Sequence, residues 1–167
     1  MPRYHRCGLT DPEIELLLDG LAEAFDRKSW HGPNLRSALR GVTAERAAWR
    51  PGNGRHNIWE LALHAAYWKY VVRRKLTGEK RGGFVLKGRD FFPRPEAGAD
   101  PSGAEWRKDI AILEHEHKRL CEVVANLTSG KHNDARWRAR VHLIRGAAAH
   151  DLYHAGQIRL LRRLYPR

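Results

Sequence analysis

Residues 147–161, AAAHDLYHAGQIRLL, form the stretch that decides how this chain folds. In a helix, where successive side chains turn by about 100°, the stretch places His150, Asp151 and His154 on the same face as its apolar residues. Two imidazoles four residues apart lie one above the other, about 5–6 Å apart at Cβ, so both rings can reach one metal ion. The face that should be buried therefore carries two candidate ligands and a carboxylate.

Three other segments share this helical periodicity. Apolar residues recur at spacings of three and four in residues 12–28, 58–76 and 103–127, as they do in residues 135–165, which contain the opening stretch. Capping-box patterns start the first three, at Thr10, Asn57 and Ser102, and two shorter helical pieces are expected at 35–40 and 44–49. Amphipathic helices of this kind bury their apolar faces against one another. We therefore expect an all-α protein, a four-helix bundle that forms a single domain over residues 1–167.

The connection between the second and third long helices is unusually long. Residues 79–100 are rich in Gly and Pro and include several apolar side chains that should pack on the body: Phe84, Val85, Leu86, Phe91 and Phe92. A connection of this length is uncommon between adjacent helices and is often functional. It suggests an up-down-down-up path, with a crossover that also covers a pocket. A crossover with no role in ligand binding is the alternative.

The chain is strongly basic, with 31 Lys and Arg against 19 Asp and Glu, a net charge of +12 and a pI near 10.3. Such an excess favours anionic partners. The basic residues are scattered along the chain, however, so solvated helix faces are the favoured interpretation. An anionic small molecule is the next alternative, and a nucleic acid is less favoured still.

The composition also indicates where in the cell the protein is expected. No apolar run approaches the ~18–20 residues that cross a bilayer, so no membrane association is expected. The first residues lack the apolar core of a signal peptide, and Cys7 and Cys121 are too few for a disulfide framework. We expect a cytoplasmic protein in which Cys121 is a core residue.

Further histidines fall on the predicted apolar faces. His64 lies at the edge of the stripe of the second long helix, and His117 lies at the centre of the third. A buried imidazole without a partner costs about 1–3 kcal/mol, so each could simply bond to a carbonyl, or several could share one metal ion. For His117 a core or orienting role is favoured over contact with a metal or substrate. His31, where the first long helix ends, is a weaker site candidate.

Three neutral imidazoles around a divalent ion leave a position open, as in catalytic sites. The His150–His154 segment also resembles the His-Glu-x-x-His helix of metalloproteases. Its second residue, Asp151, is one methylene shorter than Glu, which shortens the reach of a general base. No segment shows strand periodicity, so a peptidase is disfavoured.

Three motifs resemble a known family: SWHGPNL at 29–35, IWELALHAAYW at 58–68 and HDLYHAGQIRLLR at 150–162. They are similar to the DinB/YfiT-like superfamily of bacterial metalloenzymes over nearly the whole chain. The resemblance implies a four-helix bundle with zinc or nickel held by His64, His150 and His154. It also implies a thiol-dependent S-transferase or isomerase that acts on a small molecule with a low-molecular-weight thiol, and a homodimer.

The resemblance leaves the remaining roles open. Asp151 could be a base or an acceptor for a histidine N–H, and Gln157, one turn after His154, could be a polar support. The basic surface would suit a carboxylated thiol or an anionic substrate. A non-catalytic metal-binding or small-ligand-binding stress protein is the second hypothesis, and a basic nucleic-acid-binding module is the third.

Overall fold

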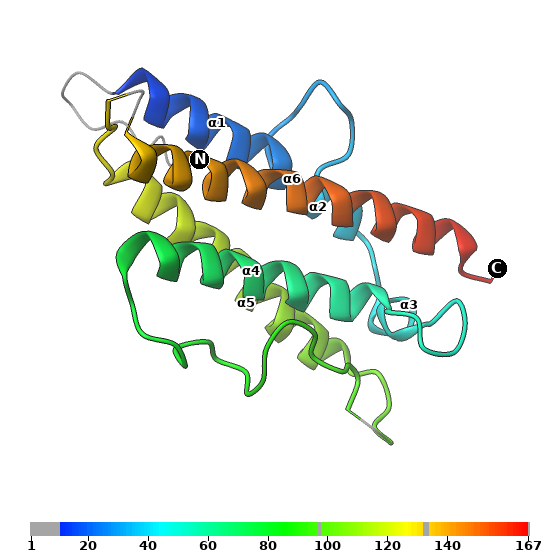
Figure 1. The fold of residues 1–167 in the computed structure, drawn as a ribbon. Coiled ribbons are helices and arrows are strands. Elements are labelled where there is room, and N and C mark those ends of the chain that lie inside the picture. The colour runs from blue at the N-terminus through cyan, green and yellow to red at the C-terminus, as the bar shows by residue number, and fades with distance from the viewer. Residues whose placement is uncertain (1–10, 97, 132–133, 167) are drawn as a thin grey trace.

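The computed structural model describes residues 11–96, 98–131 and 134–166. Over these residues the chain is helical and contains no strand, which confirms the all-α class (Figure 1). Six helices follow one another along the chain: α1 (Pro12–Phe25), α2 (Leu35–Leu39), α3 (Ala44–Ala48), α4 (Ile58–Thr77), α5 (Gly103–Ala125) and α6 (Ala135–Leu164).

Side-chain caps set most of these boundaries. The side chains of Asn57 and Ser102 accept hydrogen bonds from backbone N–H groups in the first turns of α4 and α5, as predicted. Gly78 ends α4 in the left-handed conformation, with φ 81°. The prediction for α1 was displaced: Asp11 is its N-cap, and Thr10 lies outside the described residues.

The four long helices close into a bundle. α1 packs against α5 and α6, and α4 packs against the same two helices. Figure 1 shows α4 and α5 running in one direction, with α1 and α6 running in the other. Leu21, Leu120 and Ile144 fill the core between α1, α5 and α6. The short helices α2 and α3 lie toward the opposite end of the bundle from this core, where α2 contacts α6 and α3 contacts α4.

The crossover between α4 and α5 is fastened to the bundle at several points. Phe92 is buried beside Tyr67, with ring centroids 5.7 Å apart. Arg94 donates to Asp109 of α5 at 2.8 Å, and the Asn57 side chain donates to the carbonyl of Arg94 at 2.6 Å. These contacts fix a segment that has no helix of its own.

One side chain of the crossover departs from the prediction. Val85 is 68% exposed, so the expectation that it packs on the body was wrong. The neighbouring Phe84 and Leu86 do pack on the core, and Phe91 joins them. The chain bends repeatedly from Phe84 to Asp90, and over this stretch Phe84 and Leu86 are half-buried while Val85 and Lys87 are exposed.

Two predictions from composition were also tested. No helix in the described part of the chain is long and apolar enough to cross a membrane. Cys121 is buried in the core, as expected, and burial raises the pKa of its thiol to about 11. Cys7 lies outside the described residues.

Candidate metal centre

Three histidines from two helices meet in the bundle. His64 comes from α4, and His150 and His154 come from successive turns of α6. The Nε2 atom of His150 lies 3.1 Å from that of His64 and 3.0 Å from that of His154. Among the described residues they are the one group of three or more His, Cys or carboxylate side chains close enough to share an ion, with one ligand atom of each within 4.8 Å of the others.

The outer nitrogens of two of these rings are fixed by oxygen acceptors. His64 Nδ1 lies 3.0 Å from the carbonyl oxygen of Asp90 and 3.2 Å from its carboxylate. His154 Nδ1 lies 2.6 Å from Oε1 of Gln157, whose amide nitrogen donates to the Tyr153 hydroxyl. Oxygens of these kinds accept hydrogen bonds, so Nδ1 must carry the proton in both rings. The Nε2 lone pairs of His64 and His154 are therefore free and turned toward His150.

Aromatic rings hold His64 in this orientation. Phe91 stacks on the His64 ring, with centroids 4.0 Å apart, and Trp68 meets it edge-on at 6.2 Å. Asp90 adopts φ 71°, a left-handed conformation that is uncommon outside glycine. This conformation brings its carbonyl to His64 while its carboxylate accepts from the Trp68 indole N–H at 3.0 Å.

The three rings are neutral at ordinary pH. Burial, together with the neighbouring His154 and His64, lowers the pKa of His150 to about 3. Burial also lowers the pKa of His154 to about 4, an effect that its hydrogen bond to the Gln157 side-chain oxygen opposes. The pKa of His64 is lowered as well, mainly by burial. Neutral imidazoles are the form that binds a metal ion.

These residues fit a divalent metal ion. Zn–N bonds of about 2.0–2.1 Å at tetrahedral angles place neighbouring nitrogens about 3.3 Å apart. The observed separations of 3.0 and 3.1 Å are within a few tenths of an ångström of that value. Histidine ligands usually donate their other N–H to a carboxylate, carbonyl or water, as His64 does to Asp90. The donor set and its outer contacts therefore suit a three-histidine site.

Asp151 faces a different neighbour. Its carboxylate forms an ion pair with Lys69 of α4, and both side chains are 1% exposed. Burial raises the pKa of Asp151, and the Lys69 ammonium opposes this effect. A carboxylate engaged by a buried ammonium is poorly placed to accept a proton from a substrate. The ion pair instead connects α6 to α4 next to His150.

His117 and His31 lie apart from the three-histidine group. The His117 ring stacks on Phe25, with centroids 3.8 Å apart, and its Nε2 lies 3.5 Å from the Cys121 sulfur. Its Nδ1 has no hydrogen-bond partner among the described residues. His31 is exposed in the turn after α1. The structure brings neither residue to the group.

Four residues around the site were not predicted as site residues from the sequence: Trp68, Lys69, Asp90 and Phe91. Lys69 falls on the buried side of α4, and a charge in such a position calls for a partner. The other three surround His64, and the long crossover was the signal for two of them. The sequence gives no register for a loop, so their contacts could not be deduced.

Comparison with known proteins agrees with these findings. No curated protein and no solved structure matches the chain. A family model does match, over residues 29–158, which span all of α4 and both histidines of α6. This match confirms the resemblance found in the sequence motifs, and the chain belongs to the DinB superfamily.

Proposed function

We propose that His64, His150 and His154 bind a divalent metal ion and that the protein is an enzyme acting on a small molecule at that ion. One observation carries the proposal. Three neutral imidazoles from two helices turn Nε2 toward a common point, and two of them are held there by acceptors at Nδ1. Zinc and nickel both suit imidazole ligands.

The chain itself orients the ligands. Phe91 stacks on the His64 ring and Trp68 meets it edge-on, and the hydrogen bond to Gln157 restrains rotation of the His154 ring. A bound divalent ion with an open position would supply Lewis acidity toward a water or a thiol. Membership in the DinB superfamily favours the thiol, so we propose a thiol-dependent S-transferase or isomerase.

Metal analysis of protein purified without a metal-binding tag tests the first part. We expect one zinc or nickel ion per chain in the wild type, and loss of that ion in His150→Ala and in His154→Ala. Wild-type protein that is free of metal and takes up none on titration would end the proposal.

A thiol-consumption assay with a panel of electrophiles tests the second part. Metal-dependent loss of thiol, absent in the His154→Ala variant, is the expected result. A metal-binding protein without catalysis has the same ligands, and it would show full metal content with no turnover for any thiol.

A further inference from the structure

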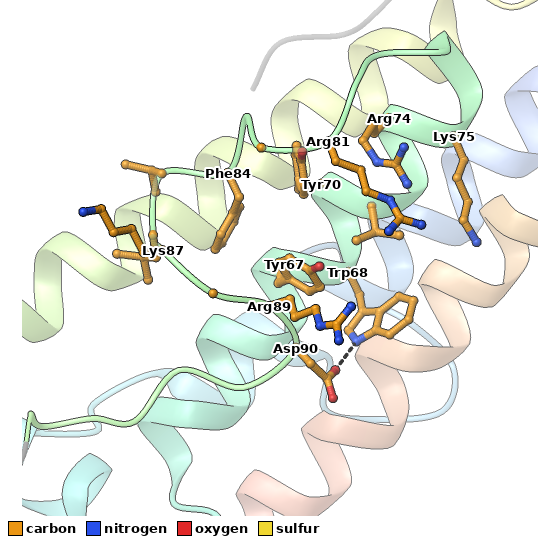
Figure 2. A pocket seen from close by; sticks show the side chains of 15 residues that line it. Tyr67, Trp68, Tyr70, Arg74, Lys75, Arg81, Phe84, Lys87, Arg89 and Asp90 are labelled. Atoms are coloured by element: carbon orange, nitrogen blue, oxygen red, sulfur yellow. Dashed lines mark hydrogen bonds between the residues drawn. The ribbon is translucent and has the colours of Figure 1, made fainter.

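A cavity of about 690 Å³ lies between α4 and the crossover, and its lining includes Trp68 and Asp90, which both contact His64. Cavities of roughly 300–1,000 Å³ are typical of small-molecule sites. Figure 2 shows its side chains, with Trp68 hydrogen-bonded to Asp90. The neighbouring metal centre does not account for this cavity, whose lining has its own chemistry.

The walls of the cavity are aromatic. Tyr67, Trp68 and Tyr70 come from α4, and Phe84 comes from the crossover. Phe84 lies edge-on to Tyr67, with centroids 5.3 Å apart, and Tyr70 lies 5.5 Å from it. The Tyr70 hydroxyl accepts from the backbone N–H of Gly83, which holds the crossover over this wall. Such a wall suits an occupant with a flat or apolar body.

The charge of the lining is strongly one-sided. Five basic residues line the cavity: Arg74, Lys75, Arg81, Lys87 and Arg89. None of these five has a carboxylate within 4.0 Å in the described part of the chain. The one acid of the lining, Asp90, is already engaged by Trp68 and His64. Unpaired cations gathered around a concavity attract anions and raise their local concentration.

The cavity and the metal centre share a wall. Trp68 lines the cavity, and its ring centroid lies 6.2 Å from that of His64 and 6.1 Å from that of His150. Asp90 also belongs to both, because its carbonyl binds His64. A molecule held against Trp68 is therefore separated from His64 and His150 by that one side chain.

We infer that this cavity binds a small anion with two or more acidic groups on an apolar or aromatic body, and that this anion is the substrate presented to the three-histidine centre. The second half rests on the proposed function, whereas binding in the cavity does not need the metal ion. A concavity of this size favours a small molecule over a nucleic acid.

Calorimetric titration of the full chain with naphthalene-2,6-disulfonate tests this inference, with naphthalene-2-methanol as the uncharged comparison. We expect the disulfonate to bind at least tenfold more tightly, with or without zinc, and more weakly as salt rises. The double substitution Arg81→Gln/Arg89→Gln should weaken disulfonate binding at least tenfold. Arg138→Gln, which removes an exposed arginine of α6 outside the cavity, should change it less than twofold.

Three results would overturn the inference: equal affinity for the two probes, an equal loss in Arg138→Gln, or displacement of the disulfonate by equimolar ten-residue oligothymidylate. Zinc titration of the same samples separates the two proposals. Zinc uptake without disulfonate binding would contradict the proposed cavity site and support the proposed metal centre. Disulfonate binding without zinc uptake would contradict the proposed metal centre and support the proposed cavity site.

Discussion

The surroundings of His117 and of the three-histidine group differ, although all four rings come from long amphipathic helices. His117 lies against Phe25 and Cys121, with one nitrogen at a sulfur and the other without a partner in the described chain. In the group, by contrast, two outer nitrogens are bound to oxygens and all three inner nitrogens face one another. Position on a helix face is thus common to both, and only convergence from separate elements distinguishes a metal site from a core residue.

Loss of the bound metal ion is the largest effect expected, and it distinguishes the three-histidine group from His117 directly. Replacing His154 by Ala removes one of three ligands, so bound zinc should be lost on dialysis. His117→Asn and His142→Ala, which changes an exposed histidine of the same helix α6, should keep one zinc per chain. Elemental analysis of the three proteins makes the comparison, and zinc loss in His117→Asn would break it.

The second largest effect is expected from the buried ion pair that lies between His117 and the three-histidine group. Lys69 pairs with Asp151, the residue after His150, and its ammonium also lies 5.0 Å from the centre of the Phe25 ring. Lys69→Met leaves a buried carboxylate without its partner, which typically costs about 3–5 kcal/mol. Urea denaturation should show this loss, and Lys69→Met/Asp151→Leu should recover most of it. A single variant as stable as the wild type would show that the pair does not tie α4 to α6.

The pH dependence of stability should report His154. In the metal-free protein its pKa is lowered to about 4, while an unfolded histidine titrates near 6.5. Below pH 6.5 the unfolded chain binds a proton that the folded chain excludes, so the free energy of unfolding falls as the pH drops toward 4. The neutral His154 ring therefore costs no stability above pH 6.5. Between pH 6.5 and pH 4.5 the free energy of unfolding should fall by up to about 2.7 kcal/mol.

The matched comparison is His154→Gln, which has no imidazole at this position. Its stability should decline less steeply than that of the wild type between pH 6.5 and 4.5, measured by urea denaturation at each pH. Identical slopes would mean that the His154 ring is not kept neutral by burial.

A smaller effect should follow from the acceptor at His154. Gln157→Leu removes the oxygen that fixes the Nδ1 proton, and loss of such a contact typically lowers metal affinity about tenfold to a hundredfold. Competition with a zinc chelator measures the change. Gln157→Glu keeps an oxygen acceptor and should retain wild-type affinity or exceed it; equal weakening in both variants would exclude an orienting role.

Much of this architecture could be predicted from the sequence. Helical periodicity and caps such as Asn57 and Ser102 located the long helices within a few residues, because both depend on local interactions. The i, i+4 spacing placed His150 and His154 on one face for the same reason. The resemblance supplied His64 as their partner, and the structure brings the three together.

The loop around the site could not be predicted in the same way. Asp90 reaches His64 from 26 residues away in sequence, and its conformation depends on tertiary contacts rather than on a repeating pattern. Asp151 shows a related limit. Periodicity put its carboxylate on the face shared by His150 and His154, but which neighbour it meets depends on how α4 is rotated, and that neighbour is Lys69.

The double engagement of Asp90 has a thermodynamic consequence. Its main chain holds His64 and its carboxylate holds Trp68, so a displacement of this one residue perturbs ligation and cavity lining together. Linkage requires such coupling to be reciprocal: if an occupant of the cavity changes zinc affinity by some factor, zinc changes the occupant's affinity by the same factor.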